Sequence, residues 1–230
     1  MTQIKTVGFD ADDTLWHNER IFGAAHIALG DVLSEYVDQD RLAKVLLGMQ
    51  RKNVPIMGYG IKSFTFSMID TALDVSGGQL DGGTIAAVMN IGREMMAHPV
   101  DLLPGVADTL EEMNKHYELI LITKGDLVDQ ERKVQVSDLG NLFHHIEIVS
   151  EKRPDTYREI FGRTGGMDNS VMVGNSVKSD VLPAVHAGAW GIHVPHGVTW
   201  EMEIAEPLLD HERYLEAEDI LHAAELIRCL

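Results

Sequence analysis

Polar and charged side chains follow several short apolar runs of the sequence. Asp10 and Asp12 come directly after the run 4–9, separated from each other by one residue. The later runs end in or are followed by Thr123, Lys124, Gly125, Lys152, Asn175 and Asp180. Carboxylates together with a hydroxyl and ammonium groups are the side chains that phosphoryl transfer requires. The pattern therefore indicates chemistry on a phosphate ester.

Two carboxylates at this spacing can take two different roles in the hydrolysis of such an ester. One, held beside a metal ion, can attack phosphorus and form an aspartyl-phosphate. The other can protonate the departing alkoxide and then take a proton from the water that cleaves the intermediate. Asp10 and Asp12, with Asp180 as a third carboxylate, also form a set of hard oxygen ligands that suits Mg²⁺.

The remaining groups are suited to holding the phosphate. Thr123 and the backbone N–H groups of Lys124 and Gly125 can cradle phosphate oxygens. Lys152 supplies a compact positive charge, although the neighbouring Arg153 is chemically competent for the same role. We therefore expect Thr123, Lys124, Gly125 and Lys152 to bind phosphate.

These residues need a scaffold that brings distant segments together. The apolar runs predict buried strands at 4–9, 119–123, 146–149, 171–173 and 192–194. Helical spacing of apolar residues predicts helices that begin at Pro104 or cover 127–139, 154–163, 179–187 and 220–227. Alternating strands and helices predict an α/β fold, with a mostly parallel Rossmann-like sheet covered by helices on both faces. Ligands of such sheets bind at the carboxyl ends of the strands, where these residues stand.

The segment between the first two strands is far longer than a usual strand-to-helix connection. It carries helical periodicity at 21–36, 41–52, 61–73 and 85–96, and glycine-rich breaks separate these stretches. We therefore predict an inserted α-helical domain over residues 17–98. Residues 1–16 and 99–230 would form the catalytic core.

The motifs resemble those of the haloacid dehalogenase-like (HAD) hydrolases. The residues that carry the resemblance are Asp10-Ala11-Asp12-Asp13-Thr14, Thr123, Lys152 and Gly174-Asn175-Ser176 with Ser179-Asp180. Family members with this pattern are mostly Mg²⁺-dependent phosphatases on a Rossmann-like sheet. The position of the predicted helical insert is similar to the cap of the subgroup (C1) that is capped after the first motif.

The resemblance implies a role for each matching residue. It implies Asp10 as the nucleophile and a metal ligand, and Asp12 as the general acid/base that also ligates the metal through its main-chain carbonyl. Thr123 and Lys152 would bind the phosphate, and Asp180 would complete the metal site. Asn175 departs from the family pattern, because an aspartate usually follows the glycine of the last motif. Its amide oxygen can still ligate Mg²⁺, and whether it does so or only Asp180 does is left open.

The amino-acid composition limits which binding partners and which cellular compartment we expect. A formal net charge of −17 repels nucleic acid and anionic lipid surfaces, so we expect neither as a partner. We expect a small phosphorylated metabolite instead. The single cysteine, Cys229, excludes an intramolecular disulfide, and no signal peptide or membrane-spanning run is recognisable, which favours the cytoplasm. The oligomeric state and the identity of the substrate cannot be read from the sequence.

Other functions remain compatible with these residues. A phosphomutase would use the same nucleophile and return the phosphoryl group to a sugar. A dehalogenase is less favoured, because family members that cleave carbon–halogen bonds need no metal and generally lack the second aspartate, which here is Asp12. A non-enzymatic, phosphate-responsive binding module is the third alternative.

Overall fold

The computed structural model describes residues 3–230 and contains one sheet of six strands. Every pair of neighbouring strands is parallel, and the order across the sheet is β3-β2-β1-β4-β5-β6. The strands are β1 (Thr6–Phe9), β2 (Glu118–Lys124), β3 (His145–Val149), β4 (Ser170–Gly174), β5 (Trp190–His193) and β6 (Tyr214–Glu216). The parallel α/β fold expected from the sequence is confirmed.

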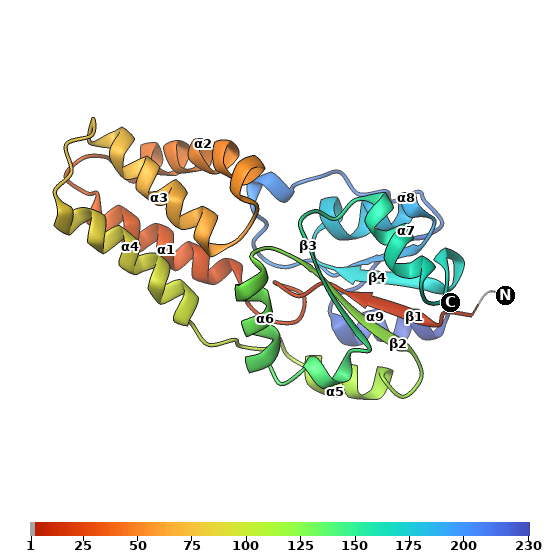
Figure 1. Cartoon of the computed structure of the whole chain (residues 1–230). Coiled ribbons are helices and arrows are strands. Elements are labelled where there is room, and N and C mark those ends of the chain that lie inside the picture. Colours follow the sequence, from red (N-terminus) through yellow and green to blue (C-terminus); the bar gives the residue numbers. More distant parts are fainter. Residues whose placement is uncertain (1–2) are drawn as a thin grey trace. The chain divides into compact units, whose positions relative to one another are not determined.

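Side chains that alternate along the strands divide the core into two layers. On β2, Leu119 and Leu121 pack into the cluster that contains α5 (Val106–Met113) and α9 (Ile220–Arg228). Ile120 and Ile122 point to the opposite face and pack with α7 (Pro154–Gly162) and α8 (Leu182–Ala187). Figure 1 shows these helix pairs on the two sides of the sheet. Both faces of the sheet are therefore buried, which explains why its strands read as continuous apolar runs.

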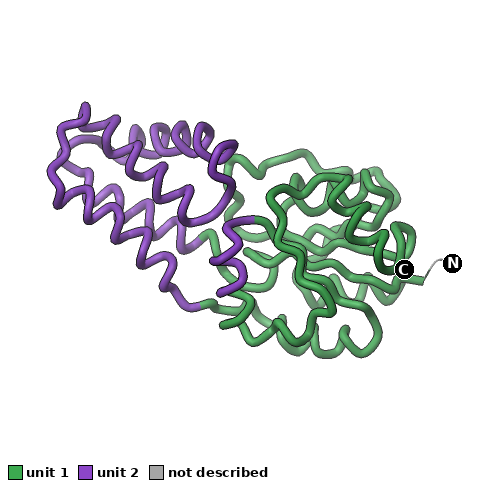
Figure 2. Tube along the Cα trace, in the orientation of Figure 1, with its two compact units in different colours: residues 1–19, 100–124, 133–230 green, residues 20–99, 125–132 purple. Residues whose placement is uncertain are grey.

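The chain forms two compact units, which are coloured separately in Figure 2. Unit 1 comprises residues 1–19, 100–124 and 133–230 and contains the sheet. Unit 2 comprises residues 20–99 and 125–132, and its helices pack around an apolar core of their own. Its main helices are α1 (Glu19–Val32), α2 (Gln39–Met57), α3 (Ile61–Val75) and α4 (Gly82–Ala97). Helix α6 (Leu127–Val136) begins in unit 2 and ends in unit 1.

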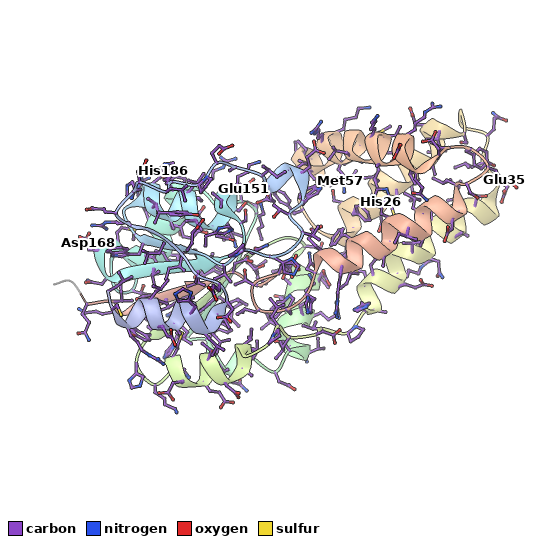
Figure 3. The ribbon with its side chains drawn as sticks, turned by 180° about the vertical axis from the view of Figure 1, so that it is seen from behind. His26, Glu35, Met57, Glu151, Asp168 and His186 are labelled. Atoms are coloured by element: carbon purple, nitrogen blue, oxygen red, sulfur yellow. The ribbon has the colours of Figure 1, made fainter. Side chains whose placement is uncertain are left out.

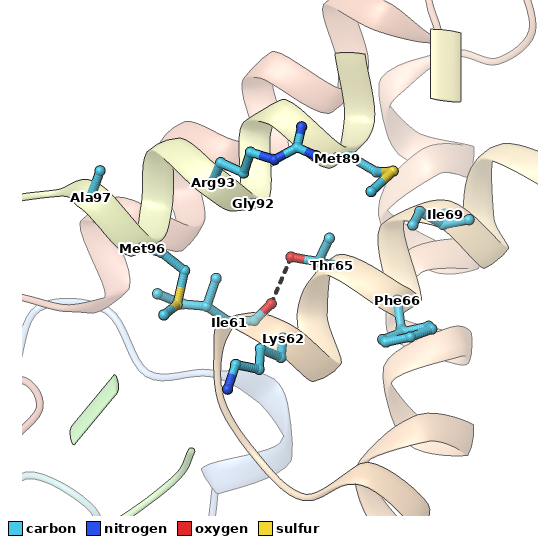
Figure 4. A pocket seen from close by; sticks show the side chains of 10 residues that line it. All are labelled: Ile61, Lys62, Thr65, Phe66, Ile69, Met89, Gly92, Arg93, Met96 and Ala97. Atoms are coloured by element: carbon cyan, nitrogen blue, oxygen red, sulfur yellow. Dashed lines mark hydrogen bonds between the residues drawn. The ribbon is translucent and has the colours of Figure 1, made fainter. Parts of the chain in front are cut away.

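Unit 2 leaves part of its apolar surface uncovered. Met57, near the end of α2, is 46% exposed (Figure 3). Helices α3 and α4 also enclose an open groove of about 520 Å³ (Figure 4). Its apolar lining includes Phe66 and Met89, and the side chains of Lys62 and Arg93 add positive charge to it. Lys62 forms an ion pair with Asp126, which also belongs to unit 2.

Some elements differ from the sequence-based expectation. The short strand β6 was not predicted, because three residues at the edge of a sheet carry too little apolar pattern to be recognised. Helix α2 continues through Pro55, which has no N–H, and it ends two residues later at Met57. The helix expected over 179–187 begins instead with a π-helical turn, Val177–Val181, before α8.

Candidate active site

Asp10 leaves β1 at the carboxyl end of the sheet. Its backbone N–H donates to the carbonyl oxygen of Val173 on the neighbouring strand at 2.9 Å, which anchors the start of the turn. The hydroxyl of Thr14 donates to Asp10 Oδ2 at 2.9 Å. The backbone of Asp13 reverses with a left-handed φ of 63°, a conformation that aspartate tolerates better than most residues. This tight turn brings Thr14 back over the Asp10 carboxylate.

A buried lysine joins two of the predicted site residues. Lys152 Nζ lies 2.5 Å from Asp10 Oδ1 and 2.7 Å from Asp180 Oδ1. The side chains of Lys152 and Asp180 are each only 1% exposed. The backbone N–H of Ser176 donates to the other Asp180 oxygen at 2.9 Å, so that carboxylate is held on both sides. Arg153, the alternative to Lys152, is exposed.

The charges of this cluster do not balance. Burial raises the pKa of Asp10 to about 7, and the nearby Asp180 charge adds to the rise; the attraction of Lys152 only partly offsets them. Burial alone would lower the pKa of Lys152, but Asp10 and Asp180 outweigh it and hold that pKa above its usual value. The lysine therefore stays charged, and two buried carboxylates share one ammonium group.

Asp12 follows Asp10 two residues later in the sequence, but its side chain has different partners. Trp16 Nε1 donates to Asp12 Oδ1 at 2.7 Å. Lys133 Nζ lies 2.9 Å and 3.1 Å from the two Asp12 carboxylate oxygens. The Asp12 side chain is 22% exposed, whereas that of Lys133 is 6% exposed. Each aspartate of the pair thus has its own lysine.

Asn175 lies against the same turn as the nucleophile candidate. Its backbone N–H donates to Thr14 Oγ1 at 3.0 Å, and its side-chain Oδ1 is 3.4 Å from that hydroxyl. Thr14 has one hydroxyl proton, and the shorter contact to Asp10 directs it there. The Asn175 amide oxygen consequently retains acceptor capacity beside the Thr14 hydroxyl that binds Asp10.

The predicted phosphate-binding residues have different surroundings in the structure. Thr123 is buried at the end of β2. The Lys124 ammonium contacts Ser179 Oγ and Glu203 Oε1, each at 2.7 Å. Gly125 has a left-handed φ of 143° and begins the segment that groups with unit 2. Lys152 is the predicted phosphate ligand that the structure places directly on Asp10.

Glu203 was not identified from the sequence. Besides Lys124, it accepts hydrogen bonds from the hydroxyls of Ser176 and Ser179. Burial tends to raise its pKa, but these partners outweigh that effect and lower it. Glu203 ends a short 3₁₀ turn, Glu201–Glu203, in an acidic stretch after β5 where no motif or periodicity distinguishes it from its neighbours. Lys133 was missed because nothing in the sequence indicates which side chain of its predicted helix faces Asp12.

Glu19 adds a further carboxylate to this acidic region of unit 1. Burial raises its pKa to about 7, and the charges of Asp13, Asp12 and Glu203 contribute to the rise. It is the first residue of α1. The region therefore carries more negative charge than its lysines neutralise.

The donor atoms around Asp10 fit a hard divalent cation. The carboxylates of Asp10 and Asp180 and the amide oxygen of Asn175 are all oxygen acceptors, the kind of ligand that Mg²⁺ prefers. Among residues 3–230, no group of three or more His, Cys, Asp or Glu side chains is arranged to hold a metal. The ligands expected from the sequence do not require such a group. Only Asp10 and Asp180 would bind through carboxylates, whereas Asn175 would use its amide oxygen and Asp12 its main-chain carbonyl.

Residues 4–188 match the sequence profile of the haloacid dehalogenase-like hydrolases. A haloacid dehalogenase-like family hydrolase from Xanthomonas campestris is 36% identical, with 98% of this chain and 91% of that chain covered and a TM-score of 0.88. The chain belongs to this family. It is therefore a hydrolase, as expected from its motifs.

More distant family structures share the fold. A 2-haloacid dehalogenase from Pseudomonas syringae pv. Tomato is 22% identical, with 99% and 100% of the two chains covered and a TM-score of 0.66. A predicted phosphoglycolate phosphatase from Haemophilus somnus is 17% identical, with 98% and 99% covered and a TM-score of 0.65. No protein of curated function matches the chain. Within residues 3–230, no helix has the length and apolar character needed to cross a membrane.

Proposed function

We propose that this hydrolase is a Mg²⁺-dependent phosphatase that acts on a small phosphorylated metabolite through an aspartyl-phosphate on Asp10. The observation that carries the proposal is the buried cluster in which Lys152 bridges Asp10 and Asp180. Two carboxylates against one ammonium leave a net negative charge, which a divalent cation would offset. The presence of Asp12 supplies the second carboxylate that stepwise hydrolysis needs. Unit 2 then corresponds to the helical cap.

The first chemical step transfers the phosphoryl group to the protein. A carboxylate oxygen of Asp10 forms a bond to phosphorus while the bond from phosphorus to the ester oxygen breaks. That oxygen leaves with the electron pair and takes a proton from the Asp12 carboxyl group, which gives an alcohol. Thr14 orients Asp10 through its hydrogen bond to Oδ2, and Lys152 contacts the other oxygen, Oδ1.

The second step regenerates the protein. Water bonds to phosphorus and gives a proton to the Asp12 carboxylate, while the bond from phosphorus to Asp10 breaks and inorganic phosphate is released. Lys152 contacts Asp10 and lies where its charge can neutralise phosphate oxygens in both steps. Asp10, Asp180, the main-chain carbonyl of Asp12 and the amide of Asn175 would hold the Mg²⁺. The ion supplies further neutralisation of the phosphate oxygens when bound.

The test is phosphate release from an aryl phosphate and from a panel of phosphorylated metabolites, with Mg²⁺ and with a chelator. We expect Mg²⁺-dependent release that Asp10→Asn abolishes. Asp155→Asn is the matched control, because Asp155 is 94% exposed and forms a surface ion pair with Arg158. Full activity of Asp10→Asn, or the same rate with chelator, would refute the proposal. Formation of an isomer without phosphate release would identify a phosphomutase instead.

One observation favours a second candidate, a metal-independent dehalogenase. Lys152 supplies a positive charge directly beside Asp10, so the carboxylate can attack carbon without a metal ion. The electron pair of the carbon–halogen bond would leave with the halide, and water would then cleave the resulting ester. Halide release from 2-chloropropionate in the presence of chelator, without phosphate release from any ester, would establish this candidate.

A further inference from the structure

A buried lysine on α6 contacts the Asp12 carboxylate. Lys133 is 5% exposed, and its ammonium lies 2.9 Å and 3.1 Å from the two Asp12 oxygens and 2.9 Å from Asn18 Oδ1. An ammonium group has three N–H donors, and these three acceptors match them. Lys133 thus faces acceptors of the protein itself, and two of these three contacts are to the Asp12 carboxylate.

A second donor also holds the Asp12 carboxylate. Trp16 is 1% exposed, and its indole N–H donates to Asp12 Oδ1 at 2.7 Å. The carbonyl of Trp16 in turn accepts from the backbone N–H of Asp13 at 2.7 Å, which ties the indole to the turn that carries Asp12. Asp12 is therefore fixed between this turn and a helix that lies 121 residues later in the sequence.

Stability alone gives little reason to bury Lys133. Moving an ammonium group out of water costs several kcal/mol, and apolar residues of similar volume are often as stabilising as a buried ion pair. The adjacent Val134 shows that this stretch of α6 also packs into the apolar core. A positional requirement on Asp12 accounts for the charge.

We propose that Lys133 is a positioning residue that holds the Asp12 side chain in place for proton transfer during phosphate-ester hydrolysis. This inference rests on the proposed phosphatase function and adds to it a residue from outside the recognised motifs. Lys152 and Lys133 then have separate tasks. Lys152 contacts the nucleophile Asp10. Lys133 instead holds the carboxylate of Asp12, apart from the cluster of Lys152, Asp10 and Asp180.

The test begins with Lys133→Met, assayed on an aryl phosphate with Mg²⁺. General acid–base catalysis typically contributes 10²–10⁴-fold, so we expect kcat to fall roughly 10- to 100-fold when Asp12 loses its orientation. We expect KM to change by less than about twofold, because Lys133 does not bind the substrate. Lys115→Met is the matched control: that lysine pairs with Glu112 at the surface and is 65% exposed.

A second readout follows the phosphorylated protein itself. An aryl oxide leaves without much protonation, so loss of Asp12 orientation slows the water-dependent step more than the first step. Acid-quenched Lys133→Met should consequently hold a larger fraction of phospho-Asp10 than the unaltered protein, as measured by mass spectrometry. Lys133→Arg, which keeps the charge and several donors, should restore part of kcat.

The decisive measurement is a double-substitution cycle. In an Asp12→Asn background, Lys133→Met should lower kcat by less than about twofold, because the group that Lys133 positions is already lost. An equal loss in both backgrounds would show a merely structural role and overturn the inference, as would unchanged kcat in Lys133→Met alone. If Lys133→Met does not fold, Lys133→Gln replaces it in the cycle. If the unaltered protein releases no phosphate from any ester, the proposed function fails first and the positioning role fails with it.

Discussion

Glu19 provides a test of the electrostatics of the site that does not depend on catalysis. Its pKa is about 7 in the folded protein, against an ordinary value of 4.5, because it is buried and lies near Asp13, Asp12 and Glu203. Between pH 4.5 and pH 7 the folded protein retains a proton that the unfolded chain has released. The unfolded state binds fewer protons in this window, so the free energy of unfolding falls as the pH rises through it.

The size of the effect follows from the size of the shift. One pKa unit corresponds to about 1.4 kcal/mol, so the full shift corresponds to about 3 kcal/mol of lost stability above pH 7. Glu19 retains some contact with solvent, which screens the neighbouring charges and reduces the expected effect to about 1–2 kcal/mol. Glu19→Gln removes the charge and keeps the shape of the side chain. We therefore expect it to stabilise the protein by about 1–2 kcal/mol more at pH 8 than at pH 5.

Urea unfolding followed by circular dichroism, at both pH values and with chelator, measures this difference. The contributions of Asp10 and Asp13, whose pKa values are also raised, largely cancel between the variant and the unaltered protein. Glu35→Gln is the matched control, because Glu35 is exposed. An equal change in stability at pH 5 and pH 8, or a loss at pH 8, would refute the electrostatic account of this region.

Three further predictions concern the Asp10 cluster. Lys152→Met leaves the carboxylates of Asp10 and Asp180 without their ammonium and should lower the free energy of unfolding by about 3–5 kcal/mol at pH 8; a loss below about 1 kcal/mol in urea unfolding would contradict the buried ion pair. A methyl group added by Gly174→Ala would clash with the Asp180 carboxylate, so we expect a loss of about 1–3 kcal/mol and slower phosphate release, whereas Gly162→Ala, with nothing within 4 Å, should be tolerated. Mg²⁺ at about 100 times its dissociation constant should stabilise the protein by about 2.7 kcal/mol in thermal unfolding, and Asp180→Asn should remove most of this gain.

The sequence alone indicated five of the six strands and the residues of the Asp10 cluster. Continuous apolar runs identify strands that are buried on both faces, and the carboxyl ends of parallel strands meet at the same edge of a sheet. Asp10, Lys152 and Asp180 follow different strands, so the rule already predicted that they meet. The structure joins them at 2.5–2.7 Å.

Only the tertiary structure decided which partners the other charged residues have. Lys133 meets Asp12 because α6 packs with one particular face toward the turn after β1, and nothing in the local sequence specifies that rotation. Glu203 contacts Lys124 from a short 3₁₀ turn that no sequence periodicity predicts. Helix and strand patterns arise from interactions between near neighbours in the chain, whereas these contacts depend on how whole elements pack. The acid/base candidate was therefore recognisable from the sequence, but the lysine that holds it was not.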